Sequence, residues 1–223
     1  MSHKGKMILF YILMMLAVPI GGKTVIPLLV EKGIIGSVTK TTEMLYINMA
    51  VYIILPVISF IVMRRELAKD TKKAGGLLSK VFPLILVVYA SSILGGILIR
   101  FIDHDTTSAN QAMLNTLQND NFLFLVYMAV FAAPIVEECV FRCCIISDRQ
   151  GFFGVLMLVI SSSLFGLVHV QQFSIGAFFS YAIIGLALGI IYLKNRNLIL
   201  NILVHSGYNA LCLILSTVLR KYI

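Results

Sequence analysis

Two adjacent acids, Glu137 and Glu138, occur with Arg142 inside an otherwise apolar stretch, NFLFLVYMAVFAAPIVEECVFRCCII, which covers residues 121–146. An ionised side chain at bilayer depth costs roughly 2.5–3.5 kcal/mol on insertion scales. Charged side chains so close together are therefore expected to face a protein interior rather than lipid. A carboxylate in such a place can form a structural ion pair, or it can act as the base that takes a proton from water.

Two further pairs of side chains follow on later apolar segments. Phe165 and His169 lie in SSSLFGLVHV, and His205 and Asn209 lie in LILNILVHSGYNAL. Both pairs, like the acid and arginine above, are spaced four residues apart, so each pair shares one helix face and points at a neighbour. We expect the three faces to converge on one polar pocket. A histidine and an asparagine opposite a carboxylate can donate hydrogen bonds to the oxyanion of a tetrahedral intermediate.

Each pair taken alone has a plainer interpretation. A buried glutamate and arginine can be a structural ion pair, a lone histidine can be a hydrogen-bonded packing residue, and Asn209 can hold two helices together. The three pairs together favour a site. Glu137, His169 and His205 also make up a catalytic zinc set with one open position, which leaves zinc as the alternative. The sequence lacks HExxH, the usual zinc-protease helix motif, so no cofactor is expected.

The composition indicates how such a site is held. Of the 223 residues, 59% are hydrophobic and 13% are charged, with a mean hydropathy of +0.96, whereas soluble domains carry about 25% charged residues. The chain is therefore predicted to be an all-α polytopic membrane helix bundle. At about 20 residues per crossing, about seven transmembrane helices are expected. They cover residues 7–30, 44–63, 77–101, 121–146, 152–172, 173–193 and 198–219, and the first could include a re-entrant piece at Pro19–Gly22.

The net charge of +8 is explained by membrane topology, and no nucleic-acid partner is expected. The first segment lacks a clear cleavage site and is interpreted as an uncleaved anchor. With the N-terminus in the cytoplasm, the excess of basic residues lies inside, as the positive-inside rule requires. The inner segments hold Lys4, Lys6, Arg64, Arg65, Lys69, Lys72, Lys73, Lys80, Arg149, Lys194 and Arg196. The outer segments hold Lys23, Lys32, Lys40, Arg100, Arg220 and Lys221.

The chain is predicted to form one integral membrane domain over residues 1–223. Residues 1–120 are expected to form scaffold spans, because they contain few polar candidates, and residues 121–219 are expected to form the catalytic half. Pro134, one turn before the acids, is expected to kink its span. The four cysteines, Cys139, Cys143, Cys144 and Cys212, are interpreted as small buried residues. Acylation of Cys143 or Cys144 is the alternative.

One difficulty accompanies the expected pocket. The predicted topology puts Glu137 and His205 in the inner half of the membrane but puts His169 near the outer end of its span. For the three side chains to meet, the fifth helix would have to begin later, near Leu156, and run past Gln172. Residues 147–155 would then lie at the membrane interface.

The motifs resemble those of a known family. EExxxR, FxxxH and HxxxN occur in this order on successive apolar segments, and each is present without substitution. This set resembles the CPBP intramembrane proteases, also called the Abi or CAAX-protease family, over about residues 121–219. The resemblance implies an all-helical bundle that hydrolyses a peptide bond within the membrane. Eukaryotic members of this family cut prenylated proteins, whereas bacterial members are linked to bacteriocin immunity, peptide maturation and signalling.

The resemblance also implies roles for the residues that match. Glu137 would activate water with assistance from His169. His205 and Asn209 would lie near the scissile carbonyl. Glu138 and Arg142 would form a structural ion pair that holds the site together, with Phe165 packed beside it.

The expected function is therefore an intramembrane endopeptidase in the bacterial plasma membrane. Its partners would be the bilayer and a membrane-associated peptide or protein substrate. A catalytically idle bacteriocin-immunity or peptide-binding protein of the same fold is the alternative. An ion-coupled or proton-coupled transporter is a third interpretation, because intramembrane acids and histidines also build proton relays. The polar groups cluster in one half, however, and no internal repeat of the transporter kind is visible.

Overall fold

The structure, a computed structural model, describes residues 2–20, 24–34, 36, 40–104, 108–170 and 174–219. Every regular element in these residues is a helix. In order they are α1 (His3–Ile20), α2 (Ile26–Glu31), α3 (Lys40–Ala74), η2 (Gly75–Lys80), α4 (Val81–Ile102), α5 (Ala109–Asp120), α6 (Phe122–Val126), η3 (Tyr127–Ala132), α7 (Ala133–Glu137), η4 (Glu138–Ile146), α8 (Gly151–His169), α9 (Ile175–Asn195) and α10 (Leu198–Leu219).

Five helical stretches of the described chain are long and apolar enough to cross a bilayer. They are Gly75–Ile102, Phe122–Ile146, Gly151–His169, Ile175–Asn195 and Leu198–Leu219. They correspond to the last five predicted spans, so the all-helical membrane bundle is confirmed. The first two predicted spans fall on α1–α2 and on α3 and are not among these five, so the count of about seven is approximate. Gly21 and Gly22 of the expected re-entrant piece lie outside the described residues.

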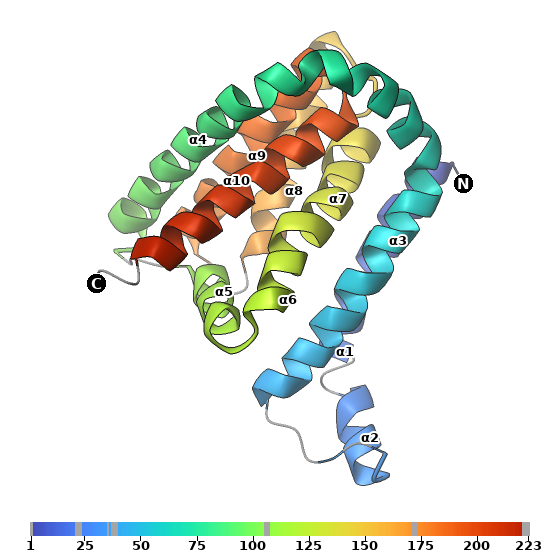
Figure 1. Cartoon of the computed structure of the whole chain (residues 1–223), viewed down its shortest axis with the longest axis vertical. Coiled ribbons are helices and arrows are strands. Elements are labelled where there is room, and N and C mark those ends of the chain that lie inside the picture. The colour runs from blue at the N-terminus through green and yellow to red at the C-terminus, as the bar shows by residue number, and fades with distance from the viewer. Residues whose placement is uncertain are drawn as a thin grey trace.

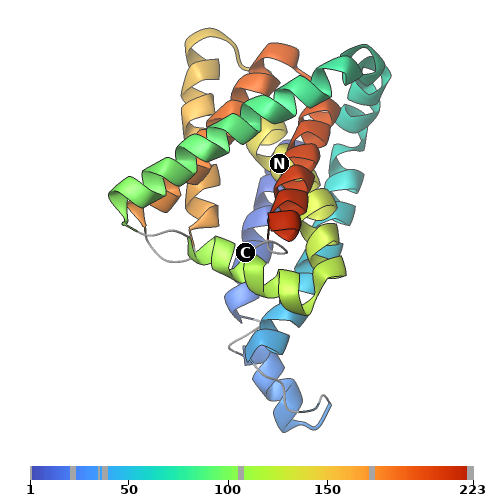
Figure 2. The same ribbon diagram turned by 60° about the vertical axis from the view of Figure 1, so that its left-hand side comes forward.

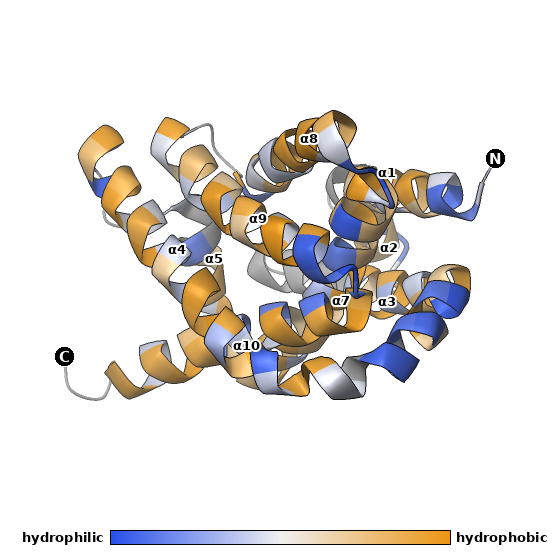
Figure 3. Ribbon diagram, turned by 90° about the horizontal axis from the view of Figure 1, so that it is seen from above, coloured by the Kyte–Doolittle hydropathy of each residue, from blue (hydrophilic) through white to orange (hydrophobic). Residues whose placement is uncertain are grey.

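The outer surface of the bundle is apolar. Phe82, Phe101, Leu123 and Phe152 are each at least two-thirds exposed, and hydrophobic residues extend along most of α4, α9 and α10 (Figure 3). Apolar patches of this extent are not tolerated in water and mark surfaces that lipid or protein covers. This surface is consistent with helices that satisfy their backbone hydrogen bonds internally while facing hydrocarbon.

The long helices run between two ends of the bundle (Figures 1 and 2). At one end, which we call the basic end, Lys4 donates to Ser147 Oγ at 2.6 Å, and Arg196 donates to the Ser147 carbonyl at 2.6 Å. Ser147 therefore links the start of α1 to the turn between α9 and α10 at this end. At the other end, which we call the far end, Gln118 of α5 donates to Thr217 of α10 at 2.8 Å.

The stretch that carries the two acids is an irregular helix. Its hydrogen bonding changes to the wider π pattern in η3 and again in η4, on either side of the five-residue α7. Pro134 lies in the first turn of α7, where its missing N–H removes a backbone hydrogen bond. Single π turns within α-helices are frequent at functional sites. Pro134 thus lies in a short α-helical segment between two π segments.

Helices α8, α9 and α4 pack closely, and α9 lies between the other two. Gly166 of α8 makes this possible, because a Cβ added there would lie 2.8 Å from the backbone oxygen of Phe178. Gly185 of α9 receives the ring of Phe165 in the same way. This close contact fixes Phe165 and His169, one turn apart on α8, relative to α9.

The expected shift of the fifth helix is wrong, although the three side chains do meet. Helix α8 begins at Gly151 and ends at His169, while Gln172 lies outside the described residues. Ser161 Oγ donates to the Phe141 carbonyl at 2.7 Å. Ser161 lies about 15 Å along α8, whereas Phe141 lies only about 8 Å before the end of η4. The first turns of α8 therefore extend beyond η4 at the basic end, which brings His169 level with Glu137.

Candidate active site

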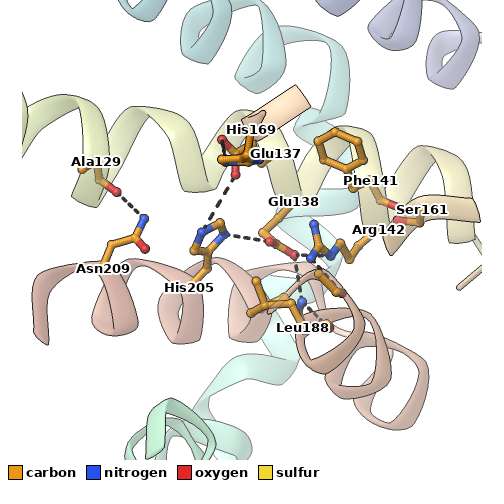
Figure 4. Close-up of polar contacts among 12 residues, drawn as sticks. Ala129, Glu137, Glu138, Phe141, Arg142, Ser161, His169, Leu188, His205 and Asn209 are labelled. Atoms are coloured by element: carbon orange, nitrogen blue, oxygen red, sulfur yellow. Dashed lines mark hydrogen bonds and ion pairs between the residues drawn. The ribbon is translucent and has the colours of Figure 1, made fainter. Parts of the chain in front are cut away.

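Glu137, at the end of α7, faces two histidines from two other helices. His169 Nε2 lies 3.7 Å from Glu137 Oε1, and His205 Nε2 lies 3.9 Å from Glu137 Oε2. Figure 4 shows the three side chains pointing toward one another. The structure thus brings together a carboxylate and two imidazoles that are far apart in the sequence, as the convergence of the motif faces predicted.

These side chains line a cavity of about 440 Å³. Glu137, Phe165, His169, His205 and Asn209 all contribute to its wall, so every predicted catalytic residue reaches it. Most of the remaining wall comes from apolar and aromatic side chains of α3, α4, α5, α6, η3 and α10. A largely apolar cavity with a few convergent polar groups is the usual form of a small-molecule or cofactor site.

Three contacts hold the His169 ring in place. Its Nδ1 lies 2.7 Å from the Phe165 carbonyl. Because a carbonyl can only accept, Nδ1 carries the proton and donates, which leaves Nε2 toward Glu137. The ring stacks on Phe165 at a centroid distance of 4.4 Å and on Tyr181 at 4.9 Å. The phenylalanine of the FxxxH motif therefore orients the histidine, as its predicted packing role requires.

Glu138 is fully buried and contacts three side chains. His205 Nδ1 lies 2.9 Å from one carboxylate oxygen, and Asn201 donates to the other oxygen at 2.8 Å. Arg142 Nε lies 3.2 Å from that second oxygen. An ionised carboxylate can only accept, so His205 Nδ1 donates and Nε2 is left to face Glu137. Glu138 thus orients the histidine that approaches its neighbour.

Arg142 is fully buried as well. It donates from one terminal nitrogen to the Gly185 carbonyl at 3.1 Å, and its guanidinium lies 4.7 Å from the centre of the Phe165 ring. Its Nε approaches Glu138 closely but does not point its N–H at the carboxylate, so the contact is an ion pair rather than a hydrogen bond. The predicted ion pair of Glu138 and Arg142 is present in the structure.

Asn209 lies one turn beyond His205 on α10. Its Nδ2 donates to the Ala129 carbonyl of η3 at 2.7 Å (Figure 4). One of the two N–H bonds of this amide is therefore committed to backbone that the π segment η3 presents. Its second N–H is available to donate a hydrogen bond to a bound group.

Sequence reasoning missed Asn201. It is fully buried, and besides Glu138 it donates to the Leu188 carbonyl of α9 at 2.9 Å. A signal was available, because Asn201, His205 and Asn209 are each four residues apart and form one polar stripe on α10.

Asp70 was also missed, because the charged stretch around it predicts only a solvated helical extension. Asp70 is instead buried. Its carboxylate accepts from the backbone N–H of Leu198 at 2.7 Å and caps the start of α10. This contact joins the end of α3 to the helix that carries the polar stripe.

A metal is the alternative chemistry for Glu137, His169 and His205. Carboxylate oxygen and imidazole nitrogen are suitable zinc ligands, and each Nδ1 has the outer partner that zinc-bound histidines usually have. However, no three His, Cys, Asp or Glu side chains in the described parts of the chain are arranged so that they could hold a metal ion. The zinc alternative is tested by chelation of the purified protein.

Comparison with known proteins adds to this geometry. Residues 119–211 match the family model described as type II CAAX prenyl endopeptidase Rce1-like. The match covers all the residues of the three motifs, and it confirms the resemblance found from them.

One curated relative also matches. The UPF0177 protein YvdC of Lactococcus lactis subsp. lactis (strain IL1403) is 32% identical over 142 residues, which is 62% of this chain. The matched region spans about half of that relative, 52% of its length. No solved structure matches the chain.

Proposed function

We propose that the protein is an intramembrane endopeptidase that hydrolyses a peptide bond of a membrane-associated peptide or protein. The observation that carries the proposal is the approach of Glu137 to two histidine Nε2 atoms at the end of a cavity. The Rce1-like match over the same residues supports it. The protein resides in the bacterial plasma membrane with its N-terminus in the cytoplasm, as the distribution of basic residues favours.

The reaction begins with a water molecule beside Glu137. Glu137 takes a proton from this water, and the resulting hydroxide attacks the carbonyl carbon of the scissile bond. His169, whose Nε2 faces Glu137, accepts a hydrogen bond from the water and positions it. The proton held by Glu137 then passes to the nitrogen of the leaving amine, and the carbon–nitrogen bond breaks. The products are one new carboxylate and one new amine.

The oxyanion of the tetrahedral intermediate needs hydrogen-bond donors. The second N–H of Asn209 is one. His205 donates from Nε2 when its ring carries protons on both nitrogens, and Glu138 supplies the negative charge that such an imidazolium needs. Fixed donors of this kind typically contribute about 3–4 kcal/mol each to the stabilisation of the transition state. No metal takes part in this scheme.

The proposal is tested by comparing the peptides in cells that express wild-type protein or Glu137→Ala. An endopeptidase should generate peptide fragments that are present only with the wild type, while both proteins accumulate in the membrane to the same level. Identical peptide profiles, with a membrane peptide bound equally by both proteins, would instead indicate an idle binding or immunity protein.

A further inference from the structure

The route from Glu137 to the basic end is closed by packed side chains. Arg142, Ile146, Leu198 and Asn201 lie on that side of the site, and each is fully buried. Beyond them the turns are tied together, with Arg196 donating to the carbonyls of Ser147 and Arg149. The side chains between Glu137 and the basic end are thus packed away from solvent.

The cavity extends in the opposite direction. Its wall includes Gln111 and Gln118 of α5 and Ser216 and Leu219 of α10, all at the far end. Gln111 is exposed and Leu219 is 56% exposed, so the cavity reaches the surface there. Figure 2 shows α5 lying across this end of the bundle, close to the end of α10.

The depth of the cavity sets the length of chain that can fill it. Along α10, His205 and Leu219 are separated by about 21 Å of helix. An extended peptide advances about 3.3 Å per residue. A substrate that enters between α5 and α10 must therefore present about six extended residues to bring a bond to Glu137.

The wall also sets the chemistry of those residues. Glu137 is the one carboxylate in the wall, and no lysine or arginine of the described chain lines it. The remaining wall is formed mostly by apolar and tyrosine side chains, with Met113, Leu114, Met128 and Leu213 among the apolar ones. A charged substrate residue placed there would lose its hydration without gaining a partner. The segment that occupies the cavity must therefore be uncharged and mostly apolar.

We infer that the substrate reaches Glu137 from the far end, as an extended, uncharged segment of about six residues. The excess of basic residues at the opposite end makes the far end extracytoplasmic. The substrate class is therefore a peptide, or the tail of a membrane protein, presented on the outer side of the membrane. This inference rests on the proposed peptidase function, and the experiment below separates the two.

The test uses right-side-out and inverted vesicles prepared from the same expressing cells. The probe is a fluorogenic peptide with six apolar residues on one side of the quenched bond and a charged tail that prevents it from crossing the membrane. Right-side-out vesicles should cleave it, and inverted vesicles should not until detergent is added. Cleavage by inverted vesicles alone, or equally by both, overturns the inference. Absence of cleavage even in detergent counts against the proposed function instead.

A second measurement does not depend on activity. In a Cys212→Ser background the remaining cysteines are buried, so a single new thiol can be followed with a membrane-impermeant maleimide. Gln111→Cys should react in intact cells, whereas Asp148→Cys, on a residue whose side chain is 88% exposed at the basic end, should react only after permeabilisation. The reverse pattern overturns the inference.

The chemistry of the segment is tested with the fluorogenic peptide in detergent. A lysine placed among its six apolar residues should lower kcat/KM about 10-fold or more.

Discussion

Glu137 and Glu138 are neighbours in the sequence, yet their carboxylates have different surroundings. Glu137 lines the cavity, and histidine nitrogens lie 3.7 and 3.9 Å from its carboxylate oxygens. Glu138 is fully buried and is held by His205, Asn201 and Arg142. Successive residues of a helix point in different directions, so the two carboxylates of one turn have different neighbours. Glu137 is free to meet water, and Glu138 orients the groups around it.

Arg142→Ala is expected to reduce the amount of folded protein. The substitution leaves Glu138 without the positive charge beside it, and breaking a buried ion pair costs roughly 3–5 kcal/mol. The measurement is the yield of monodisperse protein after extraction in mild detergent. Arg149→Ala is the matched control, because Arg149 is exposed and donates only to a carbonyl one turn earlier. A normal yield of Arg142→Ala, accompanied by complete loss of activity, would assign Arg142 to the reaction itself.

Asn201→Leu is expected to slow the reaction without weakening substrate binding. Asn201 does not line the cavity; it fixes Glu138, which fixes His205. Misplacement of a catalytic group by about 1 Å can cost 10²-fold, so kcat should fall by about 10- to 100-fold. KM should stay within about twofold. Steady-state kinetics on the folded fraction provides both constants.

Asn195→Leu serves as the control for that experiment. The Asn195 amide also donates to a backbone carbonyl, that of Ile191 at 3.0 Å, but it lies at the basic end away from the site. It should leave kcat unchanged. If Asn201→Leu lowers only the quantity of folded enzyme, with kcat per folded molecule intact, then Asn201 is structural and positions nothing.

At the scale of elements, the site depends on the register between helices, which motifs alone do not provide. The four-residue spacing was sufficient to predict that Phe165, His169, His205 and Asn209 would face a common pocket. It could not show how far α8 extends beyond η4, because that offset is fixed by the Ser161 to Phe141 hydrogen bond and by the contact at Gly166. The polar stripe on α10 was visible in the sequence, but the partner of Asn201 on η4 was not.

Asp103 is expected to make α9 sensitive to acid. Its carboxylate accepts from the Ser174 hydroxyl and from the backbone N–H groups of Gly176 and Ala177 at the start of α9. The hydrogen bond from Ser174, with those from the two backbone groups, lowers the pKa of Asp103 below its usual range. Because the pKa of Asp103 is lower in the folded state, its ionised carboxylate stabilises the folded protein fully above about pH 3.9, the pKa of an unperturbed aspartate. This stabilisation is lost as the pH falls through the folded-state pKa of Asp103.

Asp103→Ala should therefore lower the Tm in detergent by about 2–4 °C at pH 7. The difference from wild type should shrink as the pH is lowered below about 4. Asp148→Ala is the control, because Asp148 is largely exposed and approaches only Lys4, at 3.7 Å. A Tm difference for Asp103→Ala that stays constant between pH 7 and pH 3 would contradict the role of the ionised carboxylate.

At the scale of the whole molecule, composition and hydropathy were sufficient to predict an all-helical membrane bundle, and the last five predicted spans coincide with apolar helices. The first two predicted spans coincide with α1–α2 and with α3, which are helical but are not among these five. The sequence also gave no sign that α5, in a hydrophilic loop, closes part of the cavity. Its position depends on contacts with distant residues, such as that of Gln118 with Thr217.

The absence of a tightly bound metal is a further prediction. Purified, active protein should keep cleaving peptide after exhaustive chelation, and elemental analysis should find well under one zinc per chain. The reason is that the proposed scheme needs a base and hydrogen-bond donors but no Lewis acid. If chelation abolishes cleavage and one equivalent of zinc or cobalt restores it, Glu137, His169 and His205 are ligands. Asn209 alone would then keep the oxyanion role.

The central claim is that Glu137 activates water for hydrolysis of a peptide bond. The most direct measurement is mass spectrometry of an apolar peptide incubated with purified protein in ¹⁸O-labelled water. The wild type should cut an internal bond and place one ¹⁸O atom in the new carboxyl terminus. Glu137→Gln should fold with normal yield and cut about 10²–10⁴-fold more slowly, because it has lost its general base. Cleavage by Glu137→Gln at the wild-type rate, or no cleavage by folded wild type, would contradict the account.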